Sequence, residues 1–113
     1  MTEGARQPED LARLFVERVN AGDLDGLVAL YEPDAVLRVR PGQTARGHTA
    51  IRAVYAQLLE SRPHFEPGRA QDTLRSGDLA LTSSVITTGT TAEIARRQPD
   101  GTWRWVVDNP AIA

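Results

Sequence analysis

The chain of 113 residues contains no cysteine. It therefore cannot form a disulfide, a thiol nucleophile or a thiolate metal site, and the expected location is intracellular and cytoplasmic. No apolar stretch approaches the roughly 20 residues of a membrane-spanning helix. The segment from Met1 to Gly4 lacks the basic and apolar regions of a signal peptide.

An excess of charge of one sign is also lacking. The net charge is −2, with 13 basic and 15 acidic side chains mixed along the chain. Binding to nucleic acid or to an anionic membrane is therefore not expected. The apolar fraction of 41% and the charged fraction of 25% are typical of a globular protein. The length predicts one domain over residues 8–113, preceded by a loose leader at 1–7.

Three helices are predicted in the first half. Apolar residues recur at helical spacing from Pro8 onward, and Gly22 can take the left-handed conformation that ends this first helix. Asp23 is a suitable N-cap for a second helix, which is expected to end at Pro33. A third helix is predicted after Gly47, where Ile51, Val54, Tyr55, Leu58 and Leu59 form one apolar face.

The rest of the chain has the pattern of strands. A strand is predicted at 35–40, and four more at 64–74, 79–88, 91–97 and 102–107. Turn signals separate the last four: Ser76-Gly77-Asp78, Gly89 and Pro99-Asp100-Gly101. Strands joined by such short turns are antiparallel, so the predicted class is α+β.

The stretch Asn20-Ala21-Gly22-Asp23-Leu24-Asp25-Gly26-Leu27-Val28-Ala29-Leu30-Tyr31, followed by Asp34-Ala35-Val36, resembles the N-terminal signature of the nuclear-transport-factor-2-like superfamily. The helix after Gly47 and the hairpin at 99–105 fit the same pattern. The likeness covers roughly residues 9–109 and is greatest to the SnoaL-like and ketosteroid-isomerase branches. It implies a cone in which a strongly curved antiparallel sheet wraps three N-terminal helices around a pocket, and a homodimer formed through the sheet.

The chemistry of ketosteroid isomerase does not transfer with this resemblance. That enzyme uses a carboxylate base, and a tyrosine and a protonated Asp as oxyanion donors. The base position corresponds to Val39, which cannot move a proton, and the oxyanion tyrosine to Phe15. Two supporting tyrosines are retained at Tyr31 and Tyr55, and the acid donor falls near Glu93. Steroid isomerisation by that route is therefore not expected.

Asp108 is the first candidate for a catalytic group. In SnoaL-like cyclases the acid/base aspartate lies on a late strand near the pocket mouth, and the resemblance gives Asp108 this role. Strand alternation groups it with Arg104 and Val106, opposite Trp103 and Trp105. If the tryptophans face the pocket, Asp108 faces outward unless a β-bulge redirects it. The alternative is a solvated carboxylate, or one paired with an arginine.

Glu93 and Arg96 are the next candidates. They lie three residues apart on one predicted strand, so one of them should point inward. A buried Glu93 would have a raised pKa and could act as acid or base. An inward Arg96 could hold an enolate or carboxylate oxygen. Ion pairs on the outer face are the alternative for both residues.

Tyr31 and Tyr55 are expected on the inward faces of the second and third helices, where their hydroxyls could bond to each other or to a ligand. Simple core packing is the alternative. Of Trp103 and Trp105, one is expected in the core and the other in the cavity or a dimer interface. A flat ring there suits a planar or polycyclic ligand. The expected ligand-binding residues are Phe15, Tyr31, Val39, Tyr55 and Trp105.

Other site types find little support. Arg38 and Arg40 could form a cationic wall, but such arginines more often cover apolar surface at a solvated edge. His48 and His64 lie on different elements without a carboxylate cluster at ligand spacing, so no metal site is expected. The chain has neither a nucleophile-elbow nor a Gly-rich phosphate motif, and no cofactor is expected.

Two functions remain open. The first is a cofactor-independent isomerase, cyclase or hydratase that uses acid–base chemistry on a small apolar or polycyclic molecule. The second is a non-catalytic ligand-binding or dimerisation domain. The feature that discriminates between them is whether a carboxylate faces the cavity.

Overall fold

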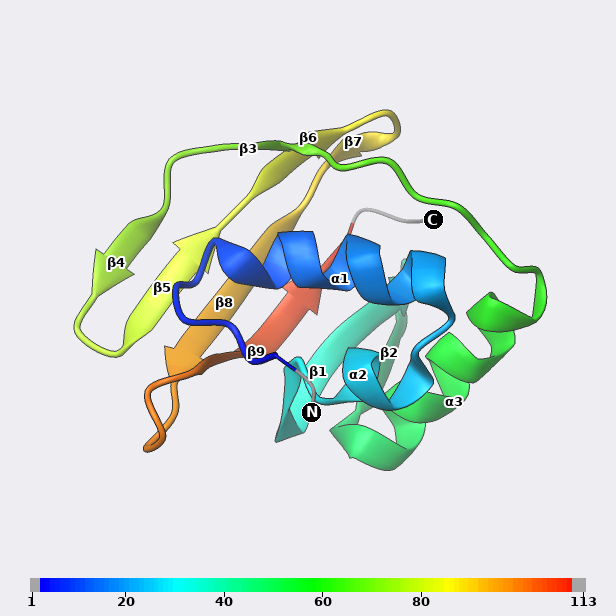
Figure 1. Ribbon diagram of the computed structural model, residues 1–113, viewed down its shortest axis with the longest axis horizontal. Coiled ribbons are helices and arrows are strands. Elements are labelled where there is room, and N and C mark those ends of the chain that lie inside the picture. The colour runs from blue at the N-terminus through cyan, green and yellow to red at the C-terminus, as the bar shows by residue number, and fades with distance from the viewer. Residues whose placement is uncertain (1–2, 111–113) are drawn as a thin grey trace.

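The computed structural model describes residues 3–110 and has three helices packed in a curved sheet (Figure 1). The helices are α1 (Asp10–Ala21), α2 (Leu24–Val28) and α3 (Gly47–Glu60). The strands are β1 (Tyr31–Arg40), β2 (Gln43–Arg46), β3 (Arg69–Ala70), β4 (Leu74–Ser76), β5 (Leu79–Thr82), β6 (Ser84–Ile86), β7 (Gly89–Thr90), β8 (Ala92–Arg97) and β9 (Trp103–Asn109). The predicted α+β class is confirmed.

Two sheets are formed by these strands. The larger has the order β2-β1-β9-β8-β5-β4, and the smaller the order β3-β6-β7. All pairs are antiparallel except β1 with β9, which are parallel and far apart in sequence. Within residues 3–110, no helix is long and apolar enough to cross a membrane.

The junction of α1 and α2 forms as the sequence predicts. Gly22 has φ +68°, and its N–H donates to Val19 O at 3.0 Å. Asp23 caps α2 by accepting a hydrogen bond from Gly26 N at 2.9 Å. A Cβ at Gly26 would collide with the Asp23 carboxylate, so only glycine fits beneath this cap.

Two predictions about Tyr31 and its surroundings are wrong. The second helix ends at Val28 rather than at Pro33, and Tyr31 begins β1 rather than completing a helical face. Strand pairing explains the difference, because Tyr31 lies opposite Trp105 of β9 and Trp105 N donates to Leu30 O at 2.7 Å. This long-range pairing overrides a helical spacing that continues only by chance.

The strand predicted at 64–74 is largely wrong, because the chain from Pro63 to Gly68 has no regular secondary structure and only short β3 and β4 follow. The strand predicted at 79–88 divides at Ser83 into β5 and β6, where the chain passes from one sheet to the other. The last two predicted strands are confirmed as β8 and β9, with boundaries shifted by one or two residues.

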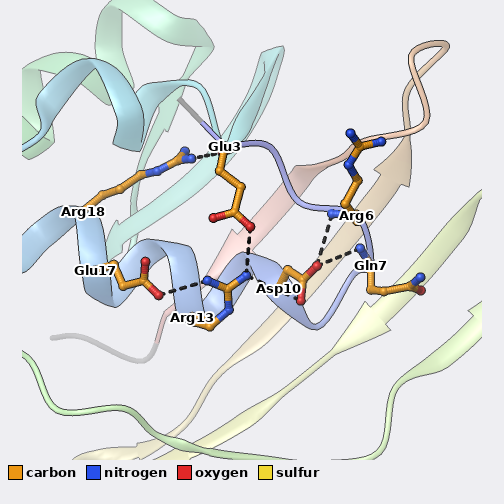
Figure 2. A network of polar contacts seen from close by, with 7 residues as sticks. All are labelled: Glu3, Arg6, Gln7, Asp10, Arg13, Glu17 and Arg18. Carbon is orange, nitrogen blue, oxygen red and sulfur yellow. Dashed lines mark hydrogen bonds and ion pairs between the residues drawn. The ribbon is translucent and has the colours of Figure 1, made fainter. Parts of the chain in front are cut away.

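The N-terminal segment contacts the domain where it is described, although a loose leader was expected. Ala5 is buried and pairs with Trp103. Arg18 of α1 is only 7% exposed; its Nη1 donates to Gly26 O at 2.7 Å and its Nη2 to Glu3 O. Figure 2 shows the bond from Arg18 to Glu3 beside the surface network of Arg13, which pairs with Glu17 at 3.0 Å.

An apolar row crosses the outer face of the larger sheet. Leu74, Leu81, Ile94 and Val107 are paired in register from β4 through β5 and β8 to β9. Each of these side chains is between 39% and 65% exposed. Four large apolar side chains aligned in this way form one continuous patch, unlike the single exposed leucines of ordinary surfaces.

Candidate functional site

A pocket of about 680 Å³ opens between α1 and the inner faces of both sheets. Its floor is formed by β8 and β9, and its outer wall by the irregular segment before β3. The lining comprises Ala12, Phe15 and Val16 of α1, the segments 64–69 and 84–88, and Thr91, Glu93, Trp105, Asp108 and Pro110. Apolar walls with a few polar groups are typical of a small-molecule site.

Asp108 lies at the floor of this pocket. The residue is only 4% exposed. Tyr31 Oη donates to its Oδ2 at 2.5 Å. Burial raises the pKa of Asp108 to about 7, with a smaller rise from Glu93, and the bond from Tyr31 opposes this shift. Asp108 can therefore hold or release a proton near neutral pH.

A β-bulge at Val106 turns Asp108 inward. Across β8 and β9, Ala95 pairs with Trp105 and Ile94 pairs with Val107, so Val106 is an extra residue in β9. After this residue the alternation is inverted, and Asp108 is buried on the same side as Trp105. Simple alternation would have placed Asp108 outside.

Glu93 lies opposite Asp108 on β8. It is 6% exposed, and its Oε1 accepts a hydrogen bond from Thr82 Oγ1 at 2.7 Å. Burial raises the pKa of Glu93, while hydrogen bonds from Thr91 and Thr82 oppose the shift. Asp108 thus accepts a hydrogen bond from a tyrosine hydroxyl, and Glu93 accepts one from a threonine hydroxyl. Both acids face the same pocket.

Tyr31 and Tyr55 form a chain that leads to Asp108. Their hydroxyl oxygens lie 2.5 Å apart. Burial raises the pKa of both phenols, and the neighbouring Asp108 raises them further, so both remain protonated. Because the Tyr31 hydroxyl donates its hydrogen bond to Asp108 and so accepts from Tyr55, the Tyr55 hydroxyl is the donor in the bond between the two tyrosines. Both tyrosines lie behind Asp108 and do not line the pocket.

Aromatic rings cover the side of the pocket next to Asp108. Phe15 lies 5.9 Å from Phe65 and 6.0 Å from Trp105, measured between ring centroids, and all three line the pocket. The Trp105 Nε1 is buried without a hydrogen-bond partner among the described residues. Phe15 and Trp105, two of the residues expected to bind a ligand, thus lie in the pocket wall.

Besides Tyr31 and Tyr55, two more predicted site residues, Arg96 and Val39, do not line the pocket. Arg96 is exposed on the outer face, where its Nε donates to Glu32 Oε2 at 2.9 Å, because it has the opposite strand parity from Glu93. Val39 packs against the core and does not line the pocket. Arg38 and Arg40 are exposed, as expected for residues at a solvated edge.

The two histidines have separate environments. The ring Nε2 of His48 lies 2.7 Å from Tyr31 O, and exposed His64 lies 3.3 Å from Glu66 Oε1. In the described part of the chain, no group of three or more His, Cys, Asp or Glu side chains could hold a metal ion.

Sequence reasoning did not identify Phe65, Thr82 and Asn20 as parts of the site. Phe65 falls in a segment with a weak strand pattern, and Thr82 reaches Glu93 only through the pairing of β5 with β8. Asn20 hydrogen-bonds to the backbone of Phe65. It lies within the signature stretch, but a sequence signature does not reveal which distant backbone a side-chain amide will contact.

The three helices and the curved sheet form the fold of solved NTF2-like proteins. The chain belongs to the SnoaL-like domain family, whose sequence profile matches residues 12–113. The epoxide hydrolase LasB of Streptomyces lasalocidi is 33% identical over 82 residues, which are 72% of this chain and 29% of that protein. The chain thus spans less than a third of that relative.

Solved structures agree on the fold. A ketosteroid isomerase-like protein from Erwinia carotovora atroseptica SCRI1043 has a TM-score of 0.68 and 21% identity, with 88% of each chain covered. An NTF2-like protein of unknown function from Pseudomonas putida KT2440 has a TM-score of 0.65 and 19% identity, with 88% of this chain and 80% of that chain covered. At these identities the likeness concerns the fold alone.

Proposed function

We propose that this protein is a cofactor-independent acid–base enzyme, an isomerase, cyclase or hydratase that acts on a small apolar or polycyclic molecule. The observation that carries the proposal is the buried Asp108 carboxyl at the floor of an apolar pocket, opposite Glu93. Burying two carboxyls costs stability, and such a cost is typical of groups kept for chemistry.

Asp108 is the principal acid/base in this proposal. Its pKa of about 7 keeps both protonation states populated near neutral pH, which suits proton transfer. Tyr31 holds Oδ2, so the other carboxyl oxygen is left to meet the substrate. Glu93 is the second carboxyl, and its hydrogen bonds to hydroxyls help it to carry negative charge while Asp108 is protonated.

Opening of an epoxide by water illustrates the division of labour, and the name of the LasB relative supports it. Protonated Asp108 gives its proton to the epoxide oxygen as the carbon–oxygen bond breaks. Water forms the new bond at that carbon and gives a proton to ionised Glu93. The product is a diol, and proton exchange with solvent restores both carboxyls.

Turnover of apolar cyclic epoxides tests this proposal, with indene oxide and 1-methylcyclohexene oxide as probes and diol formation as the readout. Asp108→Asn is expected to lower kcat by about 10²- to 10⁴-fold, the usual contribution of a general acid or base. Arg96→Gln, on the outer face, is the matched control and should retain activity. An Asp108→Asn variant as active as the wild type would contradict the proposal.

The second candidate is a non-catalytic ligand-binding or dimerisation domain. The apolar row on the outer sheet face favours the dimerisation part of it, because such a patch is typical of a protein interface. Turnover by the wild type distinguishes the two candidates. If the protein is a binding domain, the wild type should turn over no epoxide, and Asp108→Asn should still bind an apolar ligand.

A homodimer through this face is proposed for either function. Pairing two copies of the row would remove Leu81, Ile94 and Val107 from water. Light scattering at micromolar concentration should give the mass of two chains, and Ile94→Glu should give the mass of one. A monomeric mass for the wild type would contradict the dimer.

A further inference from the structure

The segment Pro63–Gly68 forms the outer wall of the pocket without regular secondary structure of its own. It leaves α3 and crosses the molecule beyond α1 to reach β3 (Figure 1). Residues 64–68 all line the pocket. A wall of this kind needs contacts from outside the segment to keep one shape, because it has no helix or strand hydrogen bonds.

Asn20, in the last turn of α1, supplies such contacts. Phe65 N donates to Asn20 Oδ1 at 2.7 Å, and Asn20 Nδ2 donates to Phe65 O at 2.9 Å. The side-chain amide thus pairs with both backbone groups of Phe65, as a neighbouring strand would do. Asparagine is suited to this role because it carries a donor and an acceptor on one short side chain.

The held backbone carries a ring that shapes the pocket. Phe65 lies against Phe15, and Phe15 lies against Trp105, so the three rings form a continuous surface next to Asp108. A shift of the Phe65 backbone would move the outermost ring of this surface. Both hydrogen bonds of the Asn20 amide go to the Phe65 backbone, so Asn20 acts on this surface through that backbone.

The other end of the wall is fixed by close packing. A Cβ at Gly68 would lie 2.8 Å from Ile86 Cγ2 and 3.0 Å from Val85 O, so this backbone lies directly against β6. Arg69 then pairs with Val85. Near the start of the wall, after α3, the contacts to Phe65 come from the side chain of Asn20.

We infer that Asn20 is a positioning residue of the pocket: its amide fixes the Phe65 backbone, and through it the ligand-binding surface. The inference rests on the proposed ligand pocket and is independent of catalysis. It also gives a role to a residue of the signature stretch that neither capping nor acid–base chemistry explains.

The test measures binding of N-phenyl-1-naphthylamine, a neutral polycyclic fluorescent probe. Asn20→Ala should weaken binding by about tenfold, since it removes two hydrogen bonds that each contribute modestly. Asn20→Asp should also weaken binding, because the acceptor for Phe65 N remains but a carboxylate oxygen replaces the donor and faces Phe65 O. Ser61→Ala, which removes a hydroxyl bonded to Leu58 O at the end of α3, is the control and should leave binding unchanged.

A double-mutant cycle separates positioning from general stabilisation. If Asn20 acts through Phe65, the Asn20→Ala change should have no further effect on binding in a Phe65→Ala background. A variant that melts earlier but binds the probe as the wild type does below its Tm would overturn the inference. The inference would also be overturned if Asn20→Ala weakened probe binding equally in the wild type and in Phe65→Ala.

Hydrogen exchange of the Phe65 amide distinguishes this inference from the ligand-pocket proposal. Asn20→Ala should speed that exchange while the core amides of β9 stay protected. If the wild type fails to bind the probe, the ligand-pocket proposal fails, and unchanged exchange at Phe65 would additionally overturn the role of Asn20. Faster exchange of the Phe65 amide in Asn20→Ala, with unchanged exchange of the β9 amides, supports the contact between Asn20 and the Phe65 backbone.

Discussion

Asp108 combines a carboxyl group, deep burial and a hydrogen bond to a hydroxyl that stays protonated. In an unfolded chain its pKa would be near 3.8, whereas in the folded protein it is about 7. The folded state therefore binds a proton more tightly than the unfolded state. The stability associated with this proton is present below pH 4 and is lost as the pH rises to 7.

This linkage gives a prediction for Asp108→Asn. Asparagine stays neutral, so the variant avoids the cost of ionising a buried carboxyl, which reaches about 4 kcal/mol above pH 7 as an order of magnitude. Urea unfolding should show a variant that gains stability relative to the wild type as the pH rises from 4 to 7, with a constant difference above that. A difference between the two proteins that does not change with pH would contradict the raised pKa.

Tyr31 has the opposite influence on Asp108, because its hydrogen bond favours the carboxylate. Tyr31→Phe removes the bond and should raise the pKa of Asp108 further, by about one unit for a charge-assisted hydrogen bond. The pH dependence of turnover, or carboxyl ¹³C NMR, measures the shift. Tyr55→Phe is the matched control one step further along the chain, and its effect should be smaller. A lowered pKa in Tyr31→Phe would contradict this assignment.

Sequence reasoning succeeds at the scale of elements where the signal is local. The apolar spacing gives α1 and α3, and the Gly22-Asp23 pair marks the junction before α2. It fails at Tyr31 and Val106 because both depend on pairing with distant strands. The bulge at Val106 decides that Asp108 enters the pocket, and nothing in the local alternation announces it.

The Asp23 cap allows a test of a local prediction. Asp23→Ala removes the acceptor for Gly26 N and should reduce the free energy of unfolding by about 1 kcal/mol, the usual value for an N-cap. Asp25→Ala is the control, since Asp25 is exposed and its carboxylate forms a surface ion pair with Arg52, an interaction that stabilises little. Equal losses in urea unfolding would show that charge, rather than capping, matters here.

At the scale of the whole molecule, the pocket combines apolar walls with two carboxyls. His64, Glu66 and Arg69 add charged or titratable groups at the segment 64–69. The resemblance of the sequence to a known superfamily predicts the fold and a pocket, and two of the residues that it names, Phe15 and Trp105, line the pocket. It cannot predict the Asn20 contact, which depends on where the irregular segment after α3 runs.

This charge distribution predicts a preference for neutral ligands. The probe N-phenyl-1-naphthylamine and its sulfonate, 8-anilinonaphthalene-1-sulfonate, share one ring skeleton and differ in charge. The sulfonate should bind at least about tenfold more weakly at pH 8, where like charges repel, and the difference should narrow at pH 5.5 as Asp108 is protonated. In Asp108→Asn the pH dependence should diminish. Tighter binding of the sulfonate at pH 8 would contradict this account.

The proposed function depends above all on Asp108 being a buried acid/base that faces the pocket. Carboxyl ¹³C NMR of the wild type across pH 3–9 tests it most directly, with Asp108→Asn identifying the signal. We expect an aspartate signal that titrates with a pKa of about 7 and is missing from the variant. An Asp108 signal that titrates near 4, as a solvated carboxylate does, would contradict it.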